Sequence, residues 1–167
     1  NNLIEGLKKG SDIYARHGLY KITSKQSLKY FLSKIADDEQ FLKAFLNHES
    51  IFDKEDGDWQ IIKRIKKLKG KETVLILKKL FFNFFKLEYY RYLDKSNFVK
   101  QIGLVINKLD KNFLLEILKD IKSTKQDEIF YRFIGYENFI ALILTPENVE
   151  TYFKAVDDLP DQAKNQA

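Results

Sequence analysis

The sequence predicts an all-α protein, and three observations support this class. The 167 residues include only seven Gly and two Pro, the residues that punctuate strands and turns. Apolar residues recur three or four positions apart in most segments, which is the period of an amphipathic helix. We find no convincing segment that alternates strictly between apolar and polar residues, as a half-buried strand would. With 44% hydrophobic residues and no Cys, the chain should bury a core without disulfides or Cys-based metal sites.

The apolar spacing divides the chain into short helices. The expected helices cover residues 2–16 (weak), 24–36, 38–48, 58–69, 71–93, 96–109, 111–123, 126–134, 136–144 and 146–157. Most connections have one to four residues, so sequential helices should pack as hairpins. The prediction is therefore an irregular multi-helix bundle or a short α-solenoid of helical hairpins. We expect a single helical domain over 1–157, weakly structured up to residue 23, and a polar C-terminal tail over 158–167.

Capping motifs mark where the first two strong helices begin. Thr23 with Gln26, and Asp37 with Gln40, have the spacing of a capping box. In this motif the first and fourth side chains satisfy each other's free backbone N–H groups. The apolar stripe of the first of these helices consists of Leu28, Phe31, Leu32 and Ile35.

The helix expected at 71–93 is the most apolar part of the chain, and we predict that it is central. Fourteen of its last 20 residues are apolar. A helix that is apolar on most sides lies in the middle of a bundle or in a membrane. Lys78, Lys79 and Lys86 argue against a membrane span, because each charge at mid-bilayer costs about 3 kcal/mol. Lys79, Asn83 and Lys86 instead form one narrow polar strip on a helix that the others surround.

Start and stop signals also define the later helices. Thr145 is the expected cap of the last helix, with Pro146 at its first position and Glu147 near the positive end of its dipole. Gly70 and Gly135 are interpreted as helix ends, because Gly tolerates the left-handed conformation found there.

A faint recurrence keeps the solenoid alternative open. Asp94, Asp110 and Asp127 each open a helix and are each followed by Phe within four residues. Pairs of helices would then repeat about every 33 residues, within the range of helical-repeat families. The residue signatures of those families are missing at matching spacing, and no family resemblance is specific enough to name.

The strongest candidate for a binding site is a concentration of positive charge. Residues 60–92 contain ten basic and two acidic residues, whereas the whole chain contains 29 and 24. The helix expected at 58–69 has a cationic polar face and a Trp near its start, which is typical of helices that lie on anionic membranes. Lys/Arg clusters also bind phosphoinositide headgroups. The candidates are Lys63, Arg64, Lys66, Lys67, Lys69 and Lys71 for anion or lipid binding, and Trp59 for membrane contact.

Two other interpretations of these charges stay open. Because 25 of the 29 basic residues are Lys, the cluster can also be a solvated helix face in a Lys-rich chain. Nucleic-acid binding is a weaker alternative, since base-specific contacts usually need Arg.

Catalytic and metal-binding motifs are weak. His17 and His48 are the only histidines and the candidates for a catalytic base, but no H-E-x-x-H, nucleophile or phosphate-loop motif accompanies them. The acidic segment 53–58 does not have the register of a calcium loop. We therefore rank catalysis last and expect neither a metal nor another cofactor.

The leading hypothesis is a non-catalytic helical binding module, cut from a larger intracellular or effector-like protein, that engages a protein partner. Aromatic residues enriched on a surface often mark such interfaces. The tyrosines that exceed the needs of a bundle are Tyr20, Tyr30, Tyr89, Tyr90, Tyr92, Tyr131 and Tyr136. The alternative is peripheral binding to an anionic membrane, with no transmembrane segment. We expect a cytoplasmic location, with membrane attachment and secretion to a host cell as open alternatives.

Overall fold

The computed structural model describes residues 22–47, 57–87 and 96–161, and all regular structure in these ranges is helical. The all-α prediction is therefore confirmed. The described helices are α3 (Lys25–Asp37), α4 (Glu39–Leu46), α6 (Gly57–Ile65), α7 (Lys71–Lys86), α8 (Ser96–Leu109), α9 (Phe113–Ser123), α10 (Gln126–Ile143) and α11 (Val149–Asp157).

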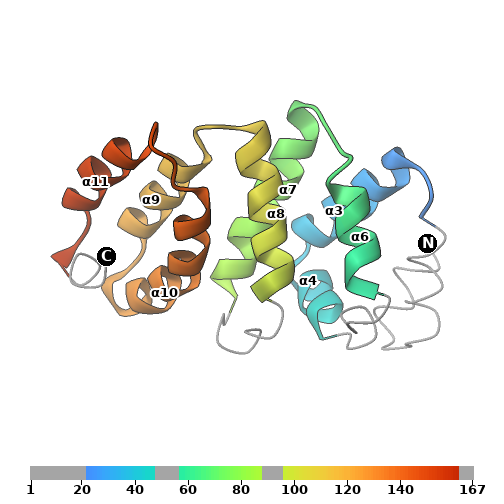
Figure 1. The fold of residues 1–167 in the computed structure, drawn as a ribbon. Helices are drawn as coiled ribbons and strands as arrows, with labels where there is room; N and C mark the ends of the chain where they lie inside the picture. Colours follow the sequence, from blue (N-terminus) through green and yellow to red (C-terminus); the bar gives the residue numbers. More distant parts are fainter. Residues whose placement is uncertain (1–21, 48–56, 88–95, 162–167) are drawn as a thin grey trace.

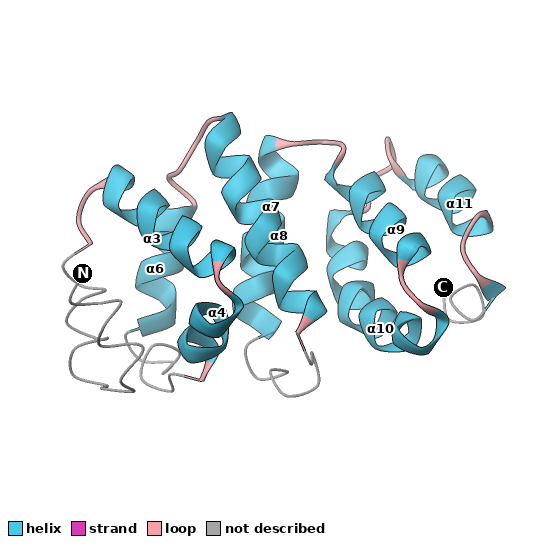
Figure 2. Cartoon of the chain, turned by 180° about the vertical axis from the view of Figure 1, so that it is seen from behind, coloured by secondary structure: helices cyan, strands magenta, loops and turns pink. Residues whose placement is uncertain are grey.

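The helices pack as an elongated array of neighbouring hairpins (Figure 1). Helix α3 packs on α7, and α9 packs on α11. Helix α8 packs on both α6 and α10. Further contacts join α3 to α4, α7 to α8 and α9 to α10. Seen from behind, the same order runs from α3, α4 and α6 at one end to α11 at the other (Figure 2).

Helix α7 is central, as predicted for the apolar segment. It packs on both α3 and α8. The centre of the Phe81 ring lies 5.0 Å from that of Phe113 in α9 and 5.2 Å from that of Phe139 in α10. One residue departs from the prediction, because the side chain of Leu75 is 69% exposed. The helix also ends at Lys86, and the last residues of the predicted helix, 88–93, lie outside the described ranges.

Two of the three residues in the polar strip of α7 contact α3. Lys79 Nζ lies 2.7 Å from a carboxylate oxygen of Asp37, and Asn83 donates a 2.8 Å hydrogen bond to the carbonyl of Ala36. The third member of the strip, Lys86, is exposed. These bonds fix the end of α3 against the middle of α7.

Helix starts differ from the sequence prediction by one residue at two places. Ser24, and not Thr23, caps α3 by accepting the backbone N–H of Ser27. Asp38, and not Asp37, caps α4 by accepting the N–H groups of Gln40 and Phe41.

The predicted helix break at Gly135 is wrong, because α10 runs continuously from Gln126 to Ile143. One buried stripe crosses the glycine on a helical period. It consists of Ile129, Tyr136, Phe139, Ile140 and Ile143. Burial of this stripe outweighs the roughly 1 kcal/mol that Gly costs inside a helix.

The last helix begins later than its start signal predicts. α11 begins at Val149, and residues 146–148 form a turn in which Asn148 accepts the backbone N–H of Thr145 at 2.7 Å. After α11 the chain remains in contact with the core, since Leu159 is buried although it belongs to the predicted polar tail.

Candidate functional site

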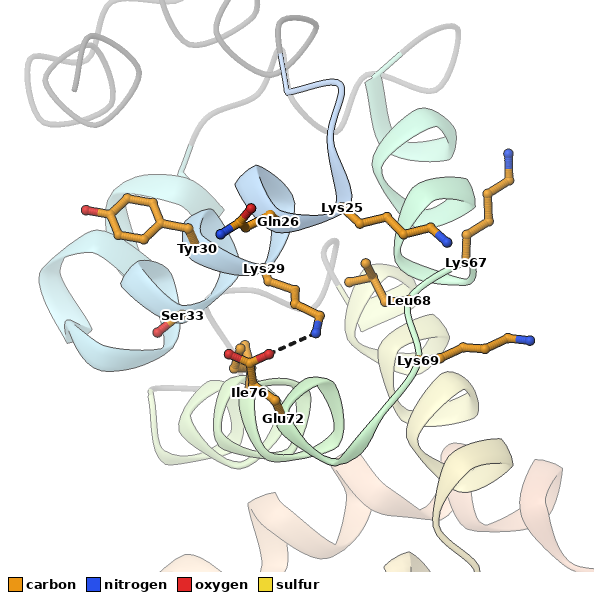
Figure 3. A pocket seen from close by; sticks show the side chains of 10 residues that line it. All are labelled: Lys25, Gln26, Lys29, Tyr30, Ser33, Lys67, Leu68, Lys69, Glu72 and Ile76. Carbon is orange, nitrogen blue, oxygen red and sulfur yellow. Dashed lines mark hydrogen bonds and ion pairs between the residues drawn. The ribbon is translucent and has the colours of Figure 1, made fainter.

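An open pocket of about 660 Å³ lies between α3, the connection from α6 to α7, and the first turns of α7. Figure 3 shows the side chains that line it. They are Lys25, Gln26, Lys29, Tyr30, Ser33, Lys67, Leu68, Lys69, Glu72 and Ile76. We call this site the lysine pocket, because four lysines face a single glutamate there, a net charge of +3.

The packing of α3 on α7 builds this pocket. Lys29 pairs with Glu72 and Asp37 pairs with Lys79, so residue numbers rise in the same direction along both helices. The two helices are therefore parallel, and their N-termini lie at the same end. Since the N-terminus of a helix carries a partial positive charge, both dipoles add to the positive potential of the lysines.

The connection from α6 to α7 supplies one wall of the pocket. Its conformation is set by Gly70, which has a φ of 95°, and by the hydroxyl of Thr73, which donates a 2.8 Å hydrogen bond to the carbonyl of Lys69. Leu68, two residues before Gly70, is buried and anchors the segment to the core. The lysines on either side of Leu68 are thereby presented to solvent at a defined place.

The predicted basic helix is shorter than expected. α6 ends at Ile65, so Lys66, Lys67 and Lys69 lie in the connection and not on a helix face. The reason is the turn that leads to Gly70, in which the N–H of Lys67 bonds to the carbonyl of Arg64 and the N–H of Leu68 to that of Ile65.

The six predicted anion-binding residues do not form one site. Lys67 and Lys69 line the pocket, whereas Lys63, Lys66 and Lys71 are exposed outside it. None of these five lysines forms an ion pair with another residue in the described ranges.

Arg64, the sixth candidate, has a structural role. Its guanidinium is half-buried and donates a 2.5 Å hydrogen bond to the carbonyl of Ile22. The bond ties α6 to the segment that precedes α3. Arg64 does not line the lysine pocket, so the prediction that it binds an anion with its neighbours is not supported by its position.

Several other predicted residues lie where the structure says nothing of their side chains. Trp59 belongs to α6, but its side chain is not among those that the structure describes. His17 and His48 lie entirely outside the described ranges. Of the seven tyrosines, Tyr30 is 57% exposed at the pocket and Tyr136 is buried.

Lys25 and Lys29, the two lysines that α3 contributes, are not among the residues predicted from the sequence. They lie four residues apart on one face of a predicted helix, an ordinary pattern for a solvated surface. Only the parallel contact between α3 and α7 brings them opposite Lys67 and Lys69, and in Figure 3 Lys25 extends from α3 toward the wall that carries Lys67.

One ion pair crosses the pocket. Lys29 Nζ lies 2.8 Å from a carboxylate oxygen of Glu72, with side-chain exposures of 26% and 72%. Lys25, Lys67 and Lys69 form no ion pair with another described residue. The pocket thus holds one neutralised lysine and three uncompensated ones.

The lining groups suit binding better than catalysis. The side chains around the pocket include no histidine and only one carboxylate, so they offer neither a general base of ordinary pKa near neutrality nor a carboxylate pair. Its hydroxyls belong to Tyr30 and Ser33, and that of Ser33 donates to Asp37 at 3.1 Å. Within the described ranges, no three His, Asp or Glu side chains are grouped as a metal site would require.

No helix in the part of the chain that the structure describes has both the length and the hydrophobicity to cross a bilayer. Comparison of the chain with protein-family models, with curated proteins and with solved structures gives no match.

Proposed function

We propose that this chain is a non-catalytic binding module that holds an acidic segment of a partner protein in the lysine pocket. The observation that carries the proposal is the charge of the pocket, in which Lys25, Lys67 and Lys69 have no ion-pair partner among the described residues. Clustered cations of one sign in a concave site attract anionic partners and raise their association rate.

A protein segment fits the open form and mixed lining of the pocket. Ile76 is half-buried beside the lysines and Tyr30 is 57% exposed at the same site, so both offer apolar surface. A pocket for a small ligand usually encloses most of it, whereas this site is open to solvent. An extended segment can lay one apolar side chain against Ile76 and Tyr30 while its carboxylates reach the lysines.

The test is binding of a fluorescein-labelled peptide in which Asp and Glu flank one Leu, measured by fluorescence anisotropy. The variant Lys25→Gln/Lys67→Gln removes two pocket charges and should weaken binding about tenfold, since each exposed charge contributes up to about 1 kcal/mol. Binding of the wild type should also weaken as salt concentration rises.

A matched control separates the pocket from general electrostatic attraction. Lys108→Gln/Lys119→Gln removes the same charge from exposed positions on α8 and α9. This variant should bind the peptide nearly as well as the wild type. Equal weakening by the two double variants would mean that net charge, and not the lysine pocket, attracts the peptide.

A second candidate function is attachment to an anionic membrane surface. The observation that favours it is the exposure of Lys63, Lys66 and Lys71 outside the pocket, without ion pairs to other described residues. Each cation near an anionic bilayer contributes about 1 kcal/mol. Three such lysines next to the pocket widen the basic surface beyond what a short peptide covers.

Co-sedimentation with vesicles tests this second function. Binding should rise with phosphatidylserine or phosphoinositide content, fall in high salt, and drop in Lys63→Gln/Lys66→Gln/Lys71→Gln but not in Lys25→Gln/Lys67→Gln. Equal binding to neutral vesicles would remove membrane attachment from consideration.

A further inference from the structure

The three uncompensated lysines of the pocket pose a question about ligand class. Glu72 already provides a carboxylate to Lys29 at 2.8 Å, so an incoming carboxylate that took its place would repeat an existing interaction. The net gain must come from Lys25, Lys67 and Lys69. The preferred ligand group is the one that uses these three ammonium groups best.

A phosphate monoester matches them better than a carboxylate does. It carries a charge of about −1.5 to −2 at neutral pH and three strong acceptor oxygens, against one charge and two oxygens for a carboxylate. Lysine binds phosphate as a flexible point charge, and three such charges attract a dianion more strongly than a monoanion. No arginine lines the pocket, so neither ligand group is held there by a planar bidentate donor.

We infer that the lysine pocket is a site for a phosphorylated side chain on the partner segment, held by Lys25, Lys67 and Lys69 while Glu72 neutralises Lys29. The inference rests on the proposed function and narrows its ligand to a phosphate monoester on a protein. Tyr30, which is exposed, and Ile76, which is half-buried, lie beside the lysines. They give a side chain of the partner segment an apolar surface to pack against, which favours a peptide over a lipid headgroup.

Glu72 offers an internal check on the charge of the ligand. Its carboxylate is 72% exposed and lies at the pocket, so it repels any bound anion. Removing this charge stabilises a dianion about twice as much in free energy as a monoanion at the same position. The fold-gain in affinity that Glu72→Gln gives for the phosphopeptide should therefore be about the square of the fold-gain for a glutamate peptide. If the latter gain is about threefold, the former is about ninefold.

The experiment uses three probes by fluorescence anisotropy or NMR titration: a peptide with one phosphoserine, the same peptide with Glu at that position, and inorganic phosphate. At neutral pH the phosphopeptide should bind at least about tenfold more tightly than the Glu peptide. Lys25→Gln/Lys67→Gln should remove that preference, and Lys108→Gln/Lys119→Gln should keep it. Glu150→Gln, which breaks the exposed Lys154–Glu150 pair on α11, is the charge control for Glu72→Gln.

A pH series adds a readout that general charge attraction does not predict. The second pKa of a phosphate monoester is about 6, so the phosphopeptide preference should fall as pH drops from about 7.5 to 5. The charged groups that face the site are Lys25, Lys29, Lys67, Lys69 and Glu72.

The outcomes distinguish phosphate recognition from binding of an acidic segment in general. Equal affinity for the phosphopeptide and the Glu peptide would overturn the phosphate inference and leave the proposed function standing. Lack of pocket-dependent binding by either peptide would overturn both. Binding to phosphoinositide vesicles that depends on Lys25 and Lys67, without phosphopeptide binding, would overturn the inference in favour of a lipid phosphate. Tighter binding of Glu72→Gln to both peptides by the same factor would contradict a dianionic ligand.

Discussion

Gly103 shows how a single residue sets the distance between helices. It lies in α8, and a Cβ atom at this position would come within 2.6 Å of Phe139 Cζ and 2.8 Å of Phe81 Cε2. Real Cβ atoms do not approach ring carbons this closely. The glycine therefore lets the rings of α7 and α10 lie directly against the backbone of α8.

We predict that Gly103→Ala lowers the free energy of unfolding by about 1–3 kcal/mol, because overpacking a dense core forces its rings to move. Urea denaturation of the variant measures this effect. In the double variant Gly103→Ala/Phe139→Leu the cost should be less than the sum of the two single changes, since the smaller side chain makes room. Additive costs would mean that the methyl group does not meet the ring of Phe139.

Tyr136 illustrates what a residue type alone does not reveal. The sequence predicts an interface role for it together with other tyrosines, but its side chain is buried. The centre of its ring lies 4.3 Å from that of Phe85 and 5.9 Å from that of Phe81. Its hydroxyl donates a 2.9 Å hydrogen bond to Asp120, which also accepts from Arg132. Burial, together with the negative charge of Asp120, raises the pKa of Tyr136 well above its ordinary value. Its role is to join α10 to α9.

At the scale of elements, one lysine joins α7 to the start of α9. Lys78 Nζ lies 2.6 Å from a carboxylate oxygen of Asp110 and 2.6 Å from one of Glu116. Burial alone would lower the pKa of Lys78, but hydrogen bonds to the two carboxylates raise it above its usual value. The hydrogen bond from Lys78, with one from the backbone of Asn112, lowers the pKa of Asp110.

The lowered pKa of Asp110 predicts a pH dependence of stability. A carboxylate whose pKa is lower in the folded state contributes stability above its unfolded value of 3.8, and this contribution is lost as pH falls through its folded value. Asp110→Asn should therefore cost up to about 1 kcal/mol near neutral pH and less as pH falls from about 5 to 2.

Urea denaturation of wild type and variant across this pH range measures the difference. Asp157→Asn removes an exposed carboxylate that forms no ion pair with another described residue, and it serves as the control. A cost of Asp110→Asn that stays constant down to pH 2 would contradict the proposed contribution of the Lys78 pair.

The ends of helices show where local signals are ambiguous. Asp37 and Asp38 are adjacent and chemically identical, so either can cap α4 as far as sequence is concerned. Lys79 of α7 decides between them, because it pairs with Asp37 and lowers its pKa, with a smaller effect from the hydroxyl of Ser33. Asp38 remains free to accept the N–H groups of Gln40 and Phe41.

In the molecule as a whole, Phe81 belongs to an aromatic cluster that joins the central helix α7 to α9 and α10. Its ring meets Phe85 of its own helix, Phe113 of α9, and Tyr136 and Phe139 of α10. The same helix packs on α3 and α8. An array of helical hairpins can unfold piece by piece when each pair contacts only its neighbours, but a shared aromatic cluster couples the pieces.

We predict a single cooperative unfolding transition. The fluorescence of Trp59 in α6 and far-UV circular dichroism of all helices should give the same urea midpoint. Phe81→Ala should lower the free energy of unfolding by about 3–5 kcal/mol, because it leaves a large cavity at the centre.

Separate midpoints for the two probes in the wild type would show that the ends unfold independently. Exposed Phe153 on α11 provides the matched control, since Phe153→Ala removes the same side chain from the surface and should cost much less than Phe81→Ala.

The sequence by itself determined the helical class, most helices, the central position of the apolar segment and the excess of charge between residues 60 and 92. These features depend on the period of apolar residues and on composition, which act over one or two helical turns. It also identified Lys67 and Lys69 as candidates, although it placed them on a helix that ends before them.

Only the tertiary structure decided which lysines share a site. Lys25 and Lys29 meet Lys67 and Lys69 because α3 packs parallel to α7, across some 40 residues of chain. Arg64 is half-buried away from the pocket for the same kind of reason, since its guanidinium bonds to the carbonyl of Ile22. Side chains that are neighbours in sequence diverge where a helix ends, and side chains from distant helices converge where their apolar stripes must be buried together.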